Sequence, residues 1–219
     1  MPKPRVLIAD DHSLLLAGLR RLVEDFCEVV GMVEDGRALI ETADRLRPDL
    51  ILLDISMPLL NGLDAAREIK RSAPNCKLLF LTMHASPTYA TEALKAGGNG
   101  YLLKQSAASE LRVAIEAVLN GQTYLTPAIT RSVIDTALKP DKQEIRRAVS
   151  DLTPRQREVL QLIGEGMGTK DIATLLNVSV KTVEFHKGRL MEQLDVHSTA
   201  DLIKFAIAEG LAAADSGLS

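Results

Sequence analysis

The sequence predicts an α/β domain built on a doubly wound, five-stranded parallel sheet, followed by a small all-α domain. Short apolar runs alternate with longer amphipathic segments through the first 120 residues, and no strand pattern returns after residue 150. The apolar runs also lack polar alternation, which is typical of strands in a parallel sheet covered by helices on both faces. A chain of 219 residues is long enough for two domains of ordinary size.

The elements of the first domain follow from this alternation in order. We expect strands over residues 5–9, 28–33, 49–53, 77–82 and 100–103. We expect the helices between and after them over residues 14–26, 37–46, 63–71, 88–95 and 107–119. Asn120 and Gly121 then form a typical helix stop, so the first domain is predicted to cover residues 1–125.

The middle of the chain loses the alternation. Residues 126–149 carry one helical pattern, over 128–138, and then a run of dense mixed charge around Pro140, which indicates a solvated linker. The second domain is predicted over residues 150–219. Its first helix opens at Thr153 and Pro154 with the pattern of an N-cap, a first-turn proline and a capping box, and should continue to Ile163.

Composition and charge exclude several classes of protein. The net charge is −3, and residues 148–219 hold 7 Lys and Arg against 10 Asp and Glu, so bulk charge does not indicate a polyanion binder. Cys27 and Cys76 lie apart in apolar contexts, which predicts buried free thiols. No apolar stretch is long enough for a signal peptide or a membrane span, so we expect a cytoplasmic protein without a membrane partner.

Charged and polar side chains follow four of the five predicted strands. Asp10 and Asp11 follow the first strand, Asp54 the third and Lys104 the fifth, while Thr82 ends the fourth. Ligands of doubly wound sheets bind at the carboxyl ends of strands, near the point where the strand order reverses. With a strand order of 2-1-3-4-5, these five side chains converge on one pocket.

Three carboxylates in one pocket repel each other unless a divalent cation neutralises them. Mg²⁺ prefers carboxylate oxygens and water, so its expected ligands are one or two of the carboxylates of Asp10, Asp11 and Asp54, the backbone carbonyl of Ser56, and water molecules. A carboxylate placed in this way can act as a nucleophile toward a phosphoryl group, assisted by a nearby ammonium and hydroxyl group. The pattern therefore predicts a phosphoryl-accepting aspartate.

The motifs ADDH, LLDISMP, LT and YLLK, in this order and spacing, resemble the receiver domain of bacterial two-component response regulators. This domain has a flavodoxin-like fold, and the resemblance covers residues 5–125. It implies that Asp54 is the phosphoacceptor, Lys104 the phosphate partner, Thr82 the switch hydroxyl and Tyr101 the switch aromatic. It also implies a sensor histidine kinase as the partner.

The segment TKDIATLLNVSVKTVEFHKGRL, residues 169–190, predicts a short helix, a tight turn and a longer helix. Ala173 lets the two helices cross closely, Asn177 tolerates a left-handed turn, and Ser179 is a good N-cap. The exposed face of the second helix holds three cations and one acid, and such a helix can enter the major groove of DNA. A helix pair that serves only for packing would show much of the same pattern.

Residues 150–212 resemble the LuxR-type helix-turn-helix, and the whole chain is similar to NarL/FixJ-type response regulators. The resemblance implies a transcription factor that binds double-stranded DNA in a sequence-specific way. It also implies a homodimer of the phosphorylated protein, with residues 199–209 as one candidate for the pairing helix. Leu202, Phe205 and Ala206 form an apolar stripe there, and a stripe with this spacing can belong either to the core of the domain or to a pairing surface. The candidates for base or phosphate contacts are Thr169, Lys170, Lys181, Thr182, Glu184, His186, Lys187 and Arg189.

Two other functions fit part of the pattern. A small phosphatase could use Asp54 as its nucleophile, but such enzymes usually carry the nucleophile after the first strand in a D-x-D arrangement, which IADDH lacks. A protein-interaction module could hold the helix pair without meeting DNA. We expect a regulator rather than an enzyme.

Overall fold

The computed structural model describes residues 2–138, 152–209 and 211–212. The chain divides into two compact units, Met1–Pro140 and Asp141–Ser219. Two apolar clusters form the core of the first unit, and a third cluster forms the core of the second. No helix within the described ranges is both long and apolar enough to cross a membrane.

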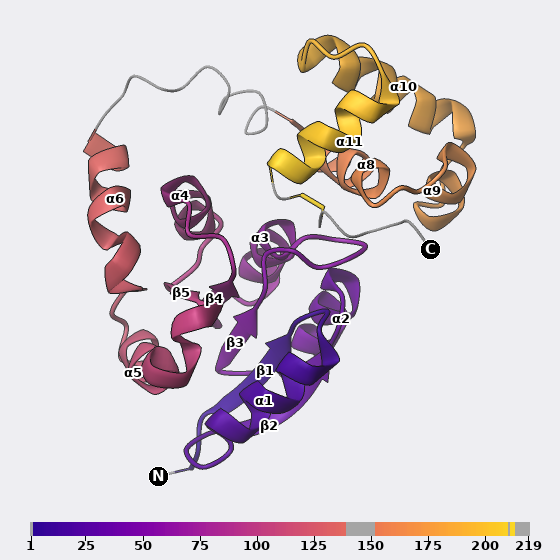
Figure 1. The fold of residues 1–219 in the computed structure, drawn as a ribbon. Helices are drawn as coiled ribbons and strands as arrows, with labels where there is room; N and C mark the ends of the chain where they lie inside the picture. The colour runs from indigo at the N-terminus through magenta and orange to yellow at the C-terminus, as the bar shows by residue number, and fades with distance from the viewer. Residues whose placement is uncertain (1, 139–151, 210, 213–219) are drawn as a thin grey trace. The chain divides into compact units, whose positions relative to one another are not determined.

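The first unit is built on a parallel sheet with the strand order β2-β1-β3-β4-β5-β6 (Figure 1). Its strands are β1 (Arg5–Ala9), β2 (Glu28–Val33), β3 (Leu50–Leu53), β4 (Lys77–Thr82), β5 (Gly100–Leu103) and β6 (Tyr124–Leu125). The order reverses beside β1, which has β2 on one side and β3 on the other. The doubly wound parallel sheet predicted from the sequence is therefore confirmed.

Helices cover both faces of the sheet. They are α1 (Ser13–Val23), α2 (Gly36–Leu46), α3 (Gly62–Ser72), α4 (Pro87–Lys95) and α5 (Ala107–Leu119), with the 3-10 turn η1 (Lys104–Ser106) before α5. The buried side chains of α1 and α5 share one apolar cluster, and those of α2, α3 and α4 share the other. Along β3, Leu50 and Leu52 face the first cluster while Ile51 and Leu53 face the second, so every residue of this strand is buried.

The sheet has six strands, so the prediction of five was incomplete. Tyr124–Leu125 forms the short strand β6, parallel to β5. Directly after it, the Thr126 N–H donates to the carbonyl oxygen of Tyr101 (3.0 Å), and Thr126 Oγ1 accepts from the Leu103 N–H (3.0 Å). These two hydrogen bonds satisfy the Tyr101 carbonyl and the Leu103 N–H, backbone groups on the edge of β5 that has no long neighbouring strand. A strand of two residues is too short to show periodicity in a sequence.

Helix α6 (Pro127–Leu138) follows β6 and packs beside α4 (Figure 1). Its Ile129 and Val133 are buried in the cluster that also holds α2, α3 and α4. The helical pattern predicted over 128–138 thus forms a helix that extends the core of the first unit. The rest of the predicted linker, residues 139–149, lies outside the described residues.

The described part of the second unit is helical, as predicted. Its helices are α8 (Pro154–Gly164), α9 (Thr169–Leu175), α10 (Val180–Gln193) and α11 (Thr199–Ala208). The capping box at the start of α8 is complete, because Thr153 Oγ1 accepts from the Gln156 N–H (3.2 Å) and Gln156 Oε1 accepts from the Thr153 N–H (2.8 Å). The sequence pattern therefore located this helix start correctly.

The apolar stripe of α11 belongs to the core of the second unit. Leu202 and Ala206 are fully buried there, and a Cβ placed on Gly164 of α8 would lie 2.6 Å from the Cβ of Ala206. Of the three stripe residues, Leu202 and Ala206 therefore belong to the core of the second unit, which is the first of the two alternatives, and they are not free to pair two copies of the chain. Their spacing is the same whether a helix packs against its own domain or against a partner.

Candidate functional site

The carboxyl ends of β1, β3 and β5 bring a lysine between two buried carboxylates. Lys104 Nζ lies 2.7 Å from Asp10 Oδ2 and 2.7 Å from Asp54 Oδ2. Asp10 is 1% exposed and Asp54 4%. Adjacent parallel strands end at the same edge of the sheet, which is why side chains so distant in sequence meet here.

Tight packing fixes the loop after Asp54. A Cβ on Gly62, the first residue of α3, would lie 1.9 Å from the carbonyl oxygen of Asp54, so only glycine fits. Within the loop, Leu59 has a φ of +64°, and the Leu60 N–H donates to the carbonyl oxygen of Pro58 (2.7 Å). This is a γ-turn with a left-handed central residue, a rare and strained conformation. Strain of this kind persists where the surrounding structure holds it in place.

The environment of the pocket changes the acidity of its groups. Burial raises the pKa of Asp54 to about 6, although the nearby Lys104 ammonium and the Ile55 N–H, which donates to Asp54 Oδ1 (2.6 Å), both act to lower it. For Lys104 burial acts to lower the pKa, but the charges of Asp54 and Asp10 and their hydrogen bonds raise it above its usual value. Lys104 therefore stays charged, and its ammonium group contacts the carboxylates of both Asp10 and Asp54.

Asp11 and His12 extend the acidic pocket toward solvent. His12 Nδ1 lies 2.7 Å from Asp11 Oδ1 and 3.2 Å from Asp10 Oδ1. One ligand atom each from Asp10, Asp11 and His12 can be chosen so that all three lie within 4.8 Å of one another. Asp10 and Asp54 share the Lys104 ammonium, and Asp11 adds a third carboxylate beside Asp10, so the pocket has excess negative charge and several oxygen donors, which fits a hard divalent cation. His12 was not among the predicted ligands.

A polar network beside the pocket joins the other predicted residues. The Tyr101 side chain is fully buried, and its hydroxyl donates to the backbone carbonyl of His84 (2.6 Å). The His84 N–H donates to Thr82 Oγ1 (3.2 Å). The His84 ring lies 3.0 Å from the Ser56 hydroxyl through Nε2 and stacks on Tyr89, and burial lowers the pKa of this ring. His84 thus links Thr82, Tyr101 and Ser56, a role that its sequence position two residues after Thr82 did not reveal.

The two helices α9 and α10 form the predicted helix-turn-helix. Ala173 is buried where the helices meet, and Val183 and Leu190 bury the inner face of α10. Asn177 has a φ of +51°, as its place in the turn predicted. Ser179 is the N-cap of α10, since its hydroxyl accepts from the Thr182 N–H (3.1 Å).

The predicted nucleic-acid contacts differ in how far they are exposed. Lys170, Lys181, Glu184 and Arg189 are exposed, whereas Thr169, Thr182, His186 and Lys187 are half-buried. The Thr182 hydroxyl already lies 2.9 Å from Ser179 Oγ. Burial, together with the charge of Arg155, lowers the pKa of His186 and so disfavours its cationic form.

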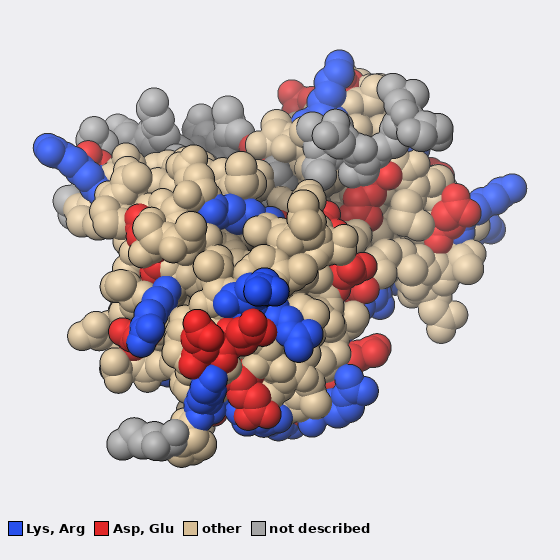
Figure 2. Space-filling model, turned by 60° about the horizontal axis from the view of Figure 1, so that its bottom comes forward, with Lys and Arg blue, Asp and Glu red and all other residues tan. Residues whose placement is uncertain are grey.

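Basic and acidic side chains lie beside each other on the face of the molecule that Figure 2 shows. Helix α10 carries three cations, Lys181, Lys187 and Arg189, beside the two exposed acids Glu184 and Glu192, and Arg189 Nη1 lies 3.4 Å from Glu192 Oε2. Contact with a polyanion would depend on this helix face rather than on bulk charge.

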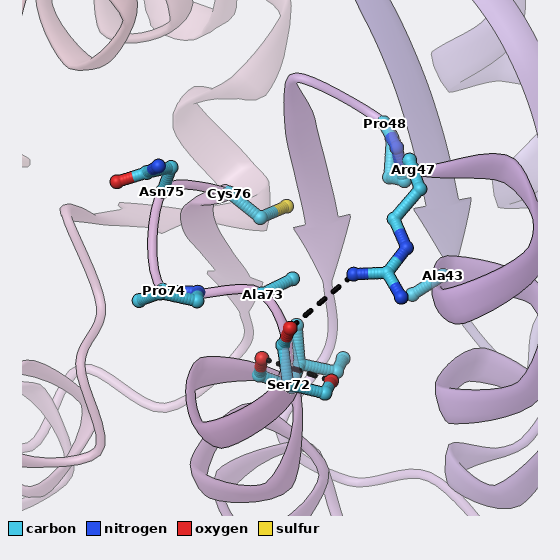
Figure 3. A pocket seen from close by; sticks show the side chains of 9 residues that line it. Ala43, Arg47, Pro48, Ser72, Ala73, Pro74, Asn75 and Cys76 are labelled. Carbon is cyan, nitrogen blue, oxygen red and sulfur yellow. Dashed lines mark hydrogen bonds between the residues drawn. The ribbon is translucent and has the colours of Figure 1, made fainter.

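A separate pocket of about 260 Å³ lies where the chain leaves α2 and α3 and enters the next strands, at the end of the sheet opposite the carboxylates. Figure 3 shows the Arg47 side chain reaching across it, and its guanidinium donates to the carbonyl oxygen of Ser72 (3.2 Å). Cys76 also lines this pocket. Both described cysteines, Cys27 and Cys76, are buried free thiols as predicted, and burial raises the pKa of each to about 11.

Family models match both parts of the chain. Residues 6–116 match the response regulator receiver domain, and residues 150–206 match the bacterial regulatory proteins of the luxR family. The oxygen regulatory protein NreC from Staphylococcus epidermidis is 36% identical over 214 residues, which cover 94% of this chain and 98% of NreC. The response regulator UvrY from Escherichia coli is 33% identical and covers 96% of this chain and 97% of its own.

Solved structures give the same result. RcsB from Salmonella typhimurium matches with a TM-score of 0.67 and 30% identity, over 95% of this chain and 98% of that one. RcsB from Salmonella enterica serovar Typhimurium, solved bound to promoter rprA in the presence of the phosphomimetic BeF3⁻, matches with a TM-score of 0.63 and 31% identity, over 93% and 98%. The chain belongs to the NarL/FixJ family of response regulators, transcription regulators that join a receiver domain to a LuxR-type helix-turn-helix DNA-binding domain.

Proposed function

We propose that Asp54 accepts a phosphoryl group from a sensor histidine kinase, and that this modification controls sequence-specific DNA binding by the second unit. One observation carries the proposal: the Lys104 ammonium contacts Asp10 and Asp54 at the same time. Because a carboxylate that is buried beside a charged lysine has both a nucleophilic oxygen and a cation at hand, it is suited to phosphoryl transfer. The membership of the chain in the response regulators supports the same assignment.

The same pocket is proposed to bind Mg²⁺. Asp10, Asp11, Asp54 and the backbone carbonyl of Ser56 would hold the ion, because all four offer the oxygen ligands that Mg²⁺ prefers. The bound ion would neutralise negative charge as the phosphoryl group arrives. Lys104 is proposed to move its hydrogen bond from the Asp54 carboxylate to a phosphoryl oxygen while it keeps its contact with Asp10.

Thr82 and Tyr101 are proposed to transmit the change. The Thr82 hydroxyl accepts from the His84 N–H, and the Tyr101 hydroxyl donates to the His84 carbonyl, so both bonds depend on one residue of the loop after β4. A phosphoryl oxygen near Thr82 would attract its hydroxyl and so alter this bonding. Such a change shifts an equilibrium only if the two states differ in these contacts.

The output is proposed to be binding of two copies of the chain to double-stranded DNA. Structures of RcsB with DNA include one described as two RcsB dimers bound to two parallel DNAs, and that protein matches 93% of this chain. In the proposed complex α10 lies in the major groove. Base or phosphate contacts come from α10 and from the start of α9, through Thr169, Lys170, Lys181, Thr182, Glu184, His186, Lys187 and Arg189.

Phosphoryl transfer tests the first step directly. The full chain is incubated with phosphoramidate and Mg²⁺, and its intact mass is measured together with those of Asp54→Asn and Asp25→Asn. Asp25 is an exposed acid in the turn after α1, so it is a matched control. The parent and Asp25→Asn should gain one phosphoryl group, and Asp54→Asn should gain none. Equal uptake by Asp54→Asn would refute the assignment.

A further inference from the structure

Helix α6 packs beside α4 (Figure 1) through a small set of buried side chains. Among residues 127–135 the buried positions are Ile129 and Val133, which lie in the same apolar cluster as the buried side chains of α4. The adjacent residue, Ile134, is 51% exposed. Local opening of a folded protein needs least free energy where few apolar side chains are buried, so α6 is expected to open more easily than the strands of the sheet.

The start of α6 is tied to the polar network beside the pocket. The N–H of Thr126, the residue directly before the helix, donates to the carbonyl oxygen of Tyr101 (3.0 Å). The Tyr101 hydroxyl donates to the carbonyl of His84 (2.6 Å), and the Tyr101 side chain lies in the same apolar cluster as Ile129 and Val133. Tyr101 therefore contacts the network through its hydroxyl and the start of α6 through its backbone.

Helix α4, on which α6 packs, is tied to the same network by a second contact. The His84 ring stacks on Tyr89 of α4, with 4.5 Å between the ring centroids. Nε2 of the same ring lies 3.0 Å from the hydroxyl of Ser56, two residues after Asp54. His84 therefore joins the loop that carries Asp54 to α4, and α4 in turn contacts α6.

A phosphoryl group on Asp54 would act on both connections through His84. If it draws the Thr82 hydroxyl toward itself, the His84 N–H loses its acceptor, and the contacts of His84 with Tyr101 and Tyr89 change with it. We infer that phosphorylation of Asp54 loosens the docking of α6 on α4, and that the His84–Tyr89 stack transmits the change. This inference rests on the proposed phosphorylation and names the helix that responds to it. In chain order, α6 is the last described helix before the second unit.

Hydrogen exchange of the α6 amides measures this docking. The full chain is kept with or without phosphoramidate and Mg²⁺, its phosphoryl uptake is read from the intact mass, and deuterium uptake is followed in peptides that cover residues 127–138. Treatment should speed exchange in α6 at least about fivefold, the lower end of typical coupling between two sites. Exchange in β1, which lies inside the sheet, should stay unchanged and serves as the internal control.

Two adjacent residues of α6 give a matched pair of variants. Val133→Ala removes two buried methyl groups, so α6 of the untreated variant should exchange about tenfold faster than in the parent. Ile134→Ala alters an exposed side chain, so it should match the parent both without and with treatment. This pair shows whether exchange in α6 reports its packing on the first unit.

A third variant tests the route through α4. Tyr89→Leu keeps an apolar side chain but cannot stack on the His84 ring. At equal phosphoryl uptake, treatment should speed exchange in its α6 by at most half the factor seen in the parent. A variant that only weakened α4 would raise exchange without treatment and leave that factor unchanged.

The intact mass separates a failure of the inference from a failure of the proposed function. If the parent takes up no phosphoryl group, the proposed function fails and this inference fails with it. If the parent is phosphorylated but α6 exchanges at the same rate, or if Tyr89→Leu keeps the full response, the proposed function stands and the inference is overturned. Because the treated and untreated parent are compared directly, a variant that does not fold leaves the test intact.

Discussion

Replacing Asp54 by asparagine is expected to stabilise the first unit when no divalent cation is present. Burial raises the pKa of Asp54 from 3.8 to about 6, so the folded state binds this proton more tightly than the unfolded state. The stability of the parent is therefore greatest below about pH 4 and falls as the pH rises toward about 6. A shift of one pKa unit corresponds to about 1.4 kcal/mol. Ionisation of the Asp54 carboxyl group therefore lowers the free energy of unfolding of the parent by about 3 kcal/mol. Asparagine is uncharged and avoids this cost.

All three tyrosines of the chain, Tyr89, Tyr101 and Tyr124, lie in the first unit, and the sequence has no tryptophan. Urea unfolding in EDTA, followed by the tyrosine signal, thus measures the first unit alone. At about pH 7.5, Asp54→Asn should be more stable than the parent by about 3 kcal/mol, and the difference should vanish near pH 4. The control Asp25→Asn should stay within about 0.5 kcal/mol of the parent at both pH values. A variant that is no more stable than the parent at the higher pH, or a difference that persists near pH 4, would refute the reasoning.

Three further changes test other contacts. Lys104→Met leaves two buried carboxylates without their cation, so without Mg²⁺ it should lower the unfolding free energy by about 3–5 kcal/mol in the same assay; an unchanged value would contradict this. Gly62→Ala places a Cβ 1.9 Å from the Asp54 carbonyl oxygen and should cost at least about 3 kcal/mol, whereas parent-like stability would mean that the loop can move away. Ser179→Ala removes the N-cap of α10 and should cost the second unit about 1 kcal/mol by far-UV circular dichroism, with the tyrosine signal of the first unit unchanged; a loss in the first unit would count against it.

Much of the pocket could be predicted because parallel strands end at one edge of a sheet. Once five apolar runs were assigned to strands, Asp10, Asp54 and Lys104 had to lie close together, and the structure places them in contact. Helix caps and turns could also be predicted from the sequence, because the capping box of α8 and the left-handed conformation of Asn177 depend only on neighbouring residues.

Features that depend on contacts between distant parts of the chain could not be predicted from the sequence. His84 joins Thr82 and Tyr101 through its own backbone N–H and carbonyl groups, which any residue could supply, so its identity gave no signal. The stripe on α11 has the same spacing whether it faces a core or a partner.

The affinity of the full chain for its selected DNA, with and without phosphoramidate, tests most directly whether a phosphoryl group on Asp54 controls DNA binding. The same titration is made with Asp54→Asn and with Asp25→Asn. Coupling free energies between sites are typically 1–3 kcal/mol, so the parent and Asp25→Asn should bind at least about fivefold more tightly after treatment, and Asp54→Asn should not respond. An equal affinity of the parent with and without phosphoramidate, or an equal gain by Asp54→Asn, would contradict the account.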